Sequence, residues 1–280
     1  MSVPSHVGVY GGGRMGAGIA HAFLIAGARV TIIENTADTA AQAAERVTVN
    51  LARAAERGRL VGDLATVRAR LHVAADPSAV AGADLVIEAV PEDTALKVDV
   101  LTRVAAVTPG AVLATNTSSL SIDAIADRLP DPTRFLGLHF FNPVPTSDLV
   151  EIVVGRRTSS VLVADAKTWV AGLGKTAITV ADSPGFASSR LGVAIALEAM
   201  RMLEEQVASA ADIDTAMTLG YRHPTGPLRT SDLVGLDVRL AIAEHLAKEL
   251  GPRFEPPAIL RELVAEGKLG RKSGQGFYAW

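Results

Sequence analysis

The sequence predicts an α/β fold in which a doubly wound sheet domain is followed by an all-α C-terminal domain. Two observations lead to this fold class. Through the first two thirds of the chain, short runs rich in Val and Ile alternate with helix-like stretches, which is the pattern of βαβ units around a buried parallel sheet. After Asp182-Ser183-Pro184-Gly185 the alternation stops, and the remaining segments have a helical pattern. We therefore expect one domain over 1–183 and a second over 184–280.

The expected elements follow in order along the chain. The apolar runs predict strands at 7–10, 30–33, 71–74, 85–88, 112–115, 135–139, 149–154 and 177–180. Helix-like stretches separate them, at 15–26, 36–58, 95–108, 121–129 and 161–173. In the C-terminal domain we expect helices at 186–207, 209–219, 230–250 and 257–266. The second of these begins at Ser209, whose spacing to Asp212 fits a capping box.

Composition narrows the chemistry and the partners. The chain is 49% hydrophobic and 20% charged, with a formal net charge of −3 at pH 7. This balance is not typical of proteins that bind nucleic acid or anionic membranes, so we expect neither partner. The chain has no cysteine, which excludes disulfides, a thiolate metal site and a cysteine nucleophile. We expect no metal.

The N-terminal segment gives no sign of export. No basic region precedes an apolar stretch there, as a secretory signal would require, and no run of about 18 apolar residues occurs that could span a bilayer. We therefore expect a protein of the cytoplasm, whose reducing conditions suit a chain without thiols.

A glycine cluster separates the first expected strand from the first expected helix. It consists of Gly11, Gly12, Gly13, Arg14, Met15 and Gly16, which fit the G-x-G-x-x-G pattern. Glu34 follows at the end of the next strand, near the spacing of about 20 residues that the Rossmann dinucleotide fingerprint requires. The helix N-terminus would bind a diphosphate, and a carboxylate favours the ribose of NAD over the 2′-phosphate of NADP. The alternative is a glycine-rich turn without a ligand.

His139 is the histidine whose position indicates chemistry. It lies at the carboxyl end of an expected strand, where the ligand crevice of an open α/β sheet is found. Glu151 lies within the next apolar run, where a carboxylate is costly to bury without a partner. A pair with His139 would fix the imidazole tautomer and raise its basicity. A structural ion pair, or two unrelated residues, are the alternatives.

A third polar cluster, Asn116-Thr117-Ser118-Ser119-Leu120-Ser121, also follows an apolar run. Ser and Thr are favoured at helix N-caps, so the cluster can begin a helix. Hydroxyl groups at the carboxyl end of a strand can also contact a substrate. The two interpretations are compatible, because one segment can do both.

With these clusters, the chain resembles the L-3-hydroxyacyl-CoA dehydrogenases, and within them the short bacterial 3-hydroxybutyryl-CoA dehydrogenase type. The resemblance rests on stretches that run nearly from end to end. They are GGGRMGAGIA from Gly11, DLVIEAVPE from Asp84, NTSSLSI from Asn116, GLHFFNPVP from Gly137, LVEIV from Leu149, DSPGF from Asp182, DIDTAM from Asp212, LGYRHPTGPL from Leu219, VGLD from Val234 and LGRKSGQGFY from Leu269. It implies an NAD-dependent enzyme of fatty acid β-oxidation or a related pathway that interconverts 3-hydroxyacyl-CoA and 3-ketoacyl-CoA. It further implies a homodimer formed through the C-terminal domain.

The resemblance also implies roles for single residues. His139 matches the general base of the family, Glu151 the carboxylate that orients it, and Ser118 the serine that contacts the 3-oxygen of the substrate near the nicotinamide. Further cofactor contacts are expected from Glu92, Lys97, Asn116, Asn142 and Lys272. The basic segment Glu56-Arg57-Gly58-Arg59 falls where such enzymes hold CoA, which makes Arg57 and Asn50 the CoA candidates.

One position departs from the family pattern. After the Pro-Gly-Phe turn the family commonly has N-R-L, and that Asn joins the active site. Here the residue is Ser189, which has a shorter reach and a single donor. The departure puts the details of substrate binding in doubt but leaves the His–Glu pair in place.

Two other functions remain open. A related dehydrogenase could act on a 3-hydroxy acid without CoA, such as a sugar acid or carnitine, using the same Rossmann domain and His–Glu pair. A non-catalytic NAD-binding protein would keep the dinucleotide fold without turnover. The basic segment around Arg57 favours CoA over the first, and His139, Glu151 and Ser118 argue against the second.

Overall fold

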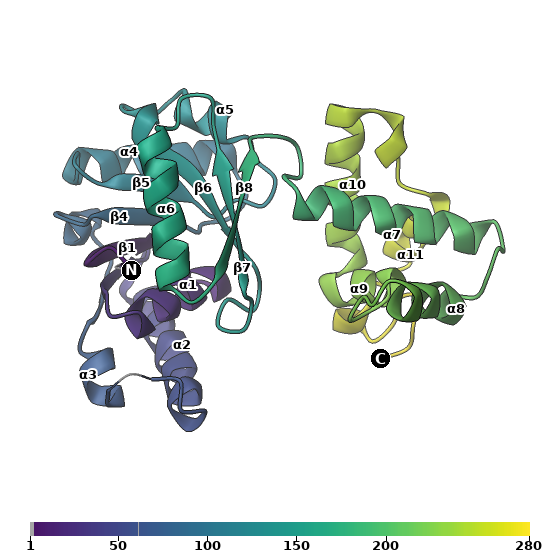
Figure 1. Ribbon diagram of the computed structural model, residues 1–280, viewed down its shortest axis with the longest axis horizontal. Helices are drawn as coiled ribbons and strands as arrows, with labels where there is room; N and C mark the ends of the chain where they lie inside the picture. Colours follow the sequence, from purple (N-terminus) through teal and green to yellow (C-terminus); the bar gives the residue numbers. More distant parts are fainter. Residues whose placement is uncertain (1–2, 61) are drawn as a thin grey trace. The chain divides into compact units, whose positions relative to one another are not determined.

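The computed structural model describes residues 3–60 and 62–280. The chain divides into two compact units, 1–183 and 184–280, which Figure 1 shows in purple to green and in green to yellow. Met1 and Ser2, which belong to the N-terminal segment considered for export, lie outside the described residues, as does Val61. Within the described part of the chain, none of the helices combines the length and the apolarity needed to cross a bilayer.

The first unit is built on an eight-stranded sheet with the order β3-β2-β1-β4-β5-β6-β7-β8. The strands are β1 (His6–Tyr10), β2 (Arg29–Ile33), β3 (Leu71–Ala74), β4 (Leu85–Glu88), β5 (Val112–Thr115), β6 (Phe135–Phe140), β7 (Leu149–Val154) and β8 (Thr176–Ala181). Neighbours from β3 to β6 are parallel. β7 is antiparallel to β6 and parallel to β8. The predicted α/β class with a doubly wound sheet is confirmed, although the last two strands run against the others.

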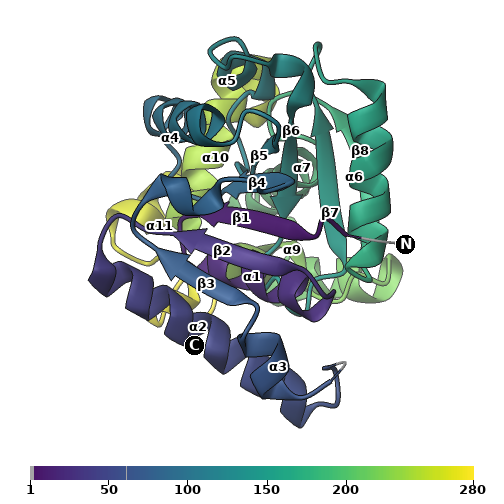
Figure 2. The same ribbon diagram turned by 90° about the vertical axis from the view of Figure 1, so that its left-hand side faces the viewer.

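Helices cover both faces of this sheet. They are α1 (Arg14–Ile25), α2 (Ala37–Glu56), α3 (Leu64–Arg68), α4 (Thr94–Val107), α5 (Ile122–Ala126) and α6 (Ser160–Gly172). From β1 the chain first moves toward β3 and then returns to β4 and continues to β6. Because crossovers are right-handed, α1 and α2 lie on one face and α4 and α5 on the opposite face (Figure 2). The core is formed by the Val, Ile and Leu side chains of the strands together with apolar residues of α1, α2 and α6.

Polar caps fix where most of these helices begin. Thr36, Asp93, Ser121 and Ser159 each accept a hydrogen bond from a backbone N–H of the first turn. α1 is the exception, since Gly13 at its N-cap offers no side chain and its first turn contains no acidic residue. The first backbone N–H groups of α1 therefore have no side-chain acceptor, and they can donate hydrogen bonds to an anionic ligand.

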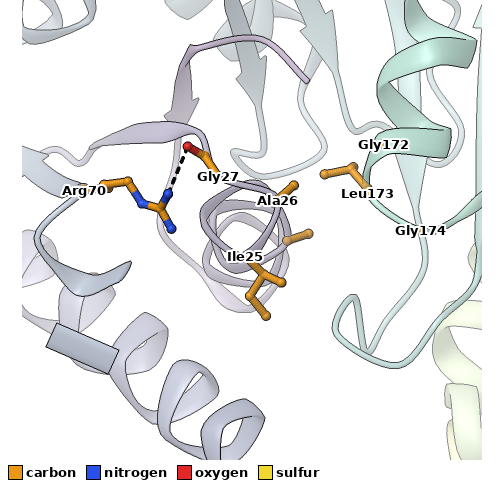
Figure 3. A pocket seen from close by; sticks show the side chains of 8 residues that line it. Ile25, Ala26, Gly27, Arg70, Gly172, Leu173 and Gly174 are labelled. Carbon is orange, nitrogen blue, oxygen red and sulfur yellow. Dashed lines mark hydrogen bonds between the residues drawn. The ribbon is translucent and has the colours of Figure 1, made fainter. Parts of the chain in front are cut away.

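Arg70, the residue before β3, binds the C-terminal end of α1. Arg70 donates hydrogen bonds to the carbonyl oxygens of Gly27 at 3.1 Å and Leu24 at 3.0 Å. A cation at this end of a helix also interacts favourably with the helix dipole. Figure 3 shows Arg70 beside Gly27 and, across a cavity of about 410 Å³, Leu173 at the end of α6. None of the predicted site residues lines this cavity.

The second unit is helical and consists of α7 (Ser188–Glu204), α8 (Ala210–Thr215), α9 (Pro227–Val234), α10 (Leu236–Leu250) and α11 (Ala258–Ala265). The predicted all-α character is confirmed. Two details differ from the expected boundaries. The helix expected over 230–250 is divided at Gly235, whose φ of +106° interrupts a helix. The helix expected over 209–219 ends at Thr215 and continues as a π-turn over Ala216–Gly220.

Two buried aspartates fasten the end of the chain onto the second unit. Asp232 accepts hydrogen bonds from the backbone N–H groups of Phe277 and Tyr278 and from the Trp280 indole, each at 2.9 Å. Asp214 accepts the Tyr278 hydroxyl at 2.7 Å, and burial together with this hydrogen bond raises the pKa of Tyr278 well above its ordinary value. These bonds hold the glycine-rich C-terminal motif in one conformation.

Candidate functional site

The glycine cluster forms a tight loop between β1 and α1. Gly11 has a φ of +96°, a conformation that L residues with side chains rarely adopt. A Cβ on Gly16 would lie 1.8 Å from the Gly11 carbonyl oxygen, and one on Gly12 would lie 2.3 Å from the Ala43 Cβ. A Cβ on Gly13 would meet no protein atom within 4 Å. The loop is therefore closed toward the protein and open at Gly13, which fits the close approach of a diphosphate to the N-terminus of α1.

Glu34 lies at the carboxyl end of β2, beside this loop. Its Oε1 accepts a hydrogen bond from the Gly12 backbone N–H at 2.6 Å, and the residue is half-buried. Arg46 of α2 donates to the Gly12 carbonyl oxygen at 3.3 Å. Glu34 is thus held at the position that the dinucleotide fingerprint requires of its ribose-binding carboxylate.

The carboxyl ends of the central parallel strands lie in one row. Tyr10 pairs with Glu88, and Glu88 pairs with Thr115, so the segments that follow β1, β4, β5 and β6 meet at one edge of the sheet. Together they form a cavity of about 370 Å³. It is lined by Met15, Ala89, Val90, Glu92, Lys97, Asn116, Ser118, His139, Phe140, Phe141 and Asn142. We call it the reaction pocket. It contains seven residues singled out by the sequence: Met15, Glu92, Lys97, Asn116, Ser118, His139 and Asn142.

His139 and Glu151 are joined directly. They are Cα partners in the antiparallel pairing of β6 with β7, and the His139 Nδ1 lies 2.7 Å from the Glu151 Oε2. The Glu151 side chain is completely buried and that of His139 is 7% exposed. When Nδ1 donates to the carboxylate, Nε2 carries the lone pair of the neutral ring. The pair can therefore accept a proton at Nε2 and stabilise the resulting imidazolium.

Glu92 organises the segment that carries Ser118. Its Oε1 accepts hydrogen bonds from the backbone N–H groups of Ser118 at 3.0 Å and Ser119 at 3.2 Å, and from the hydroxyl of Thr117. Burial alone would raise the pKa of Glu92, but the Lys97 charge and these hydrogen bonds outweigh it and lower that pKa. The carboxylate is thus stabilised in its ionised form.

Asn116 connects the same segment to β6. Its Oδ1 accepts a hydrogen bond from the backbone N–H of Phe140 at 2.9 Å, which is the residue after His139. The Asn116 side chain therefore sets the spacing between the Ser118 segment and the histidine, in addition to lining the pocket.

A second cavity of about 510 Å³ lies nearby in the same unit. It contains the CoA candidates Asn50 and Arg57 together with Arg14, Arg53, Arg59 and Lys175. We call it the basic pocket. Arg14, expected to contact the cofactor as part of the glycine cluster, lines this pocket, and its contact with the cofactor stays a prediction. Asn142 lines both cavities, so the two are adjacent.

The arginines of the basic pocket are exposed at positions 14, 53, 57 and 59. Among the described residues none of these four side chains has a hydrogen-bond or ion-pair partner. Lys175 differs, because its Nζ donates to the carbonyl oxygens of Val144 at 2.8 Å and of Ser147. Burial lowers the pKa of Lys175.

Two predicted residues belong to the second unit. Ser189 lies in the first turn of α7 and is half-buried. Lys272, expected to reach NAD, forms an ion pair with Asp237, its Nζ lying 2.6 Å from each carboxylate oxygen. Their roles at the site stay predictions.

Sequence reasoning missed three charged residues at or behind these pockets: Glu88, Arg53 and Lys175. Glu88 is completely buried and bonded to Lys97. The sequence did contain a signal for Glu88, because this acidic residue ends the apolar run 85–88 much as Glu34 follows the run 30–33. Arg53 and Lys175 had no such signal, because one lies on an exposed helix face and the other in a loop beyond α6.

Comparison with known proteins agrees with this geometry. Residues 6–183 match the model of the 3-hydroxyacyl-CoA dehydrogenase NAD binding domain, and residues 185–280 match that of the 3-hydroxyacyl-CoA dehydrogenase C-terminal domain. The chain is 38% identical to a probable 3-hydroxybutyryl-CoA dehydrogenase of Deinococcus radiodurans, over 98% of this chain and 99% of that protein. It is 39% identical to a 3-hydroxyadipyl-CoA dehydrogenase of Escherichia coli, over 98% of this chain and 58% of that protein.

Solved structures give the same result. The crystal structure of (S)-3-hydroxybutyryl-CoA dehydrogenase from Ralstonia eutropha superimposes with a TM-score of 0.95 at 38% identity, covering 99% of each chain. The resemblance seen in the sequence is thereby confirmed. The chain belongs to the 3-hydroxyacyl-CoA dehydrogenase family and is an NAD-dependent oxidoreductase that acts on 3-hydroxyacyl-CoA.

Proposed function

We propose that the chain interconverts a short L-3-hydroxyacyl-CoA, such as 3-hydroxybutyryl-CoA, and the 3-ketoacyl-CoA, with His139 as the general base and Glu151 as the residue that orients it. The observation that carries the proposal is the buried 2.7 Å bond between His139 Nδ1 and Glu151 Oε2, at the wall of a pocket that also contains Ser118. The acyl group is taken from the relatives named 3-hydroxybutyryl-CoA dehydrogenase.

In this mechanism the chain's own residues handle a proton. The His139 Nε2 accepts it from the 3-hydroxyl group as the C3–H bond breaks, and Glu151 stabilises the imidazolium through Nδ1. The Ser118 hydroxyl donates a hydrogen bond to the same substrate oxygen. Bound NAD would supply the acceptor for the hydride, the hydrogen with both electrons of the C3–H bond. Gly11 to Gly16, with the uncapped N-terminus of α1, would hold its diphosphate, and Glu34 its ribose.

The CoA part of the substrate is assigned to the basic pocket. Four exposed arginines without partners among the described residues make it electropositive, which suits the phosphates of CoA. The pocket adjoins the reaction pocket at Asn142, so one extended molecule could reach from Arg57 to His139. A substrate without CoA would have no use for these charges, which favours the thioester over a free 3-hydroxy acid.

Ser189 is proposed to contact the substrate, and the second unit is proposed to form a homodimer. Large apolar side chains are exposed on it, among them Leu191, Ile195, Leu219 and Tyr221. Ile195 and Tyr221 also line an apolar cavity of about 480 Å³ between α7 and the segment after α8. A second copy of the chain would remove this surface from water. A cytoplasmic location and a part in fatty acid β-oxidation are included in the proposal on the strength of the bacterial relatives and the family's reaction.

The test is an assay of NADH consumption with a panel of 3-ketoacyl-CoA thioesters, including acetoacetyl-CoA and a dicarboxylic thioester. His139→Ala should lower kcat by about 10²–10⁴-fold, the usual contribution of a positioned base, with little change in the Kd for NADH. Near-native turnover by His139→Ala would show that another group accepts the proton. Insensitivity of the wild type to competition by free CoA would instead favour the CoA-independent reaction.

A further inference from the structure

Glu88 is a buried acidic residue for which the mechanism above has no use. It ends β4 and is completely buried. Its Oε1 accepts hydrogen bonds from the Val90 backbone N–H at 2.6 Å and from the Lys97 Nζ at 2.7 Å. Its Oε2 accepts the Thr115 hydroxyl at 2.7 Å. Burial raises the pKa of Glu88, but both of its oxygens are met by donors, one of them an ammonium group, and these donors favour the ionised carboxylate.

Lys97 connects Glu88 to the reaction pocket, because it bonds Glu88 and also lines the pocket. It is 1% exposed and donates to Glu88 and, at 3.2 Å, to the Val90 carbonyl oxygen. Its Nζ also lies 3.2 Å from the Glu92 Oε2. Glu92 in turn holds the Ser118 segment through its other oxygen. Glu88 is thus linked to the pocket on two sides, through Lys97 and through Thr115 at the end of β5.

The charges of this cluster do not balance. Two carboxylates, of Glu88 and Glu92, share the single ammonium group of Lys97, so the cluster has one negative charge in excess. The only other ionisable side chain that lines the pocket in the described part of the chain is His139, whose partner is Glu151. Within a partly dry site such a charge acts over several ångströms, because it is poorly screened.

The oxidised nicotinamide ring carries a positive charge and the reduced ring carries none. A negative cluster beside the ring therefore distinguishes the two forms of the cofactor. We propose that Glu88 is a positioning residue that holds Lys97 and Glu92 at the pocket, and that its charge favours binding of the cationic oxidised ring over the neutral reduced ring. The inference rests on the proposed function in one respect, which is that the reaction pocket receives the nicotinamide.

The experiment compares the affinities for NAD⁺ and NADH without acyl-CoA. Calorimetric titration of the wild type and of Glu88→Gln gives both dissociation constants. We expect Glu88→Gln to raise the Kd for NAD⁺ about tenfold more than the Kd for NADH, the scale of one charge acting at an effective dielectric constant of about 20. Equal changes in the two constants, or no change, would overturn the inference, because a purely structural residue alters both alike.

Two further variants keep the result decisive. Thr115→Val removes one hydrogen bond to the same carboxylate but no charge, so the ratio of the two constants should stay at the wild-type value. Glu92→Gln removes one negative charge at the partly exposed end of the cluster and should shift the ratio in the same direction as Glu88→Gln. It serves as the test if Glu88→Gln does not fold. Because these titrations involve no turnover, a wild type that binds both cofactors but reduces no 3-ketoacyl-CoA would refute the proposed function alone.

Discussion

The two pockets of the first unit differ in how their charged groups are held. In the reaction pocket each ionisable side chain is bonded within the protein: His139 to Glu151, and Lys97 to both Glu88 and Glu92. In the basic pocket the four exposed arginines have no partner among the described residues. Fixed, buried charges serve chemistry, because they cost no reorganisation when charge develops. Exposed charges can attract a phosphate-bearing ligand, and salt weakens this attraction. The contrast predicts different responses to mutation.

The largest effect is expected where the fixed bond of the reaction pocket is weakened. Glu151→Gln keeps the shape and one oxygen acceptor but removes the charge that stabilises the His139 imidazolium. We expect kcat to fall about 10²–10³-fold with a small change in KM, measured as NADH consumption with acetoacetyl-CoA. Asp165→Asn, an exposed acidic residue of α6, is the matched control. A loss confined to KM would mean that Glu151 only shapes the binding site.

A smaller effect is expected at the buried wall of the basic pocket, where His21 lies. Burial, together with the Lys175 charge, lowers the pKa of His21 from 6.5 to about 4. Between these values the unfolded chain binds more protons than the folded chain, so the free energy of unfolding falls as the pH drops from about 6.5 to 4. The contribution of His21 to this fall is at most about 3 kcal/mol.

Urea unfolding at pH 7, 6, 5 and 4 measures this contribution. His21→Gln should show a flatter dependence of the free energy of unfolding on pH than the wild type. His72→Gln, in which an exposed histidine of β3 is replaced, should keep the wild-type slope. Parallel curves for the wild type and His21→Gln would mean that His21 is protonated equally in both states.

The smallest effect is expected from the exposed charges. Arg57→Gln should raise the KM for acetoacetyl-CoA about threefold to tenfold at low salt, because one phosphate contact is worth about 1 kcal/mol at an exposed site. The difference should shrink as salt is added. Acetoacetyl-N-acetylcysteamine, which lacks the nucleotide, should show no difference between the two proteins. Arg68→Gln, outside the pocket, is the control, and a similar loss there would assign the effect to net charge.

Much of the first unit could be predicted from the sequence because its signals are local. All eight strand regions were found, since buried parallel strands leave continuous apolar runs, and four of the strands have the expected bounds, 71–74, 85–88, 112–115 and 149–154. The glycine loop could also be predicted from the sequence, because the contacts that require glycine join residues close together in the chain. A side chain on Gly16, for example, would collide with the Gly11 carbonyl oxygen. The short helix α3 was missed because only Val67 of its five residues is buried, which leaves no apolar periodicity.

Other features depended on contacts between distant segments. That β7 runs antiparallel to β6 left no trace in its composition, yet this pairing places Glu151 opposite His139. The break at Gly235 was hidden within a helical pattern. Glu88, Lys97 and Thr115 meet because β4, α4 and β5 pack side by side, and no spacing along the chain encodes that contact.

The sequence by itself determined the fold class, the dinucleotide loop with Glu34, and the identity of the groups that can do chemistry, since these depend on residue type and short-range spacing. The tertiary structure decided which of those groups work together. It joined His139 to Glu151, brought Arg14 together with the other arginines of the basic pocket, and placed the charge of Glu88 behind Lys97. The physical reason is that burial and charge pairing arise between segments far apart in the chain, where only packing sets the distances.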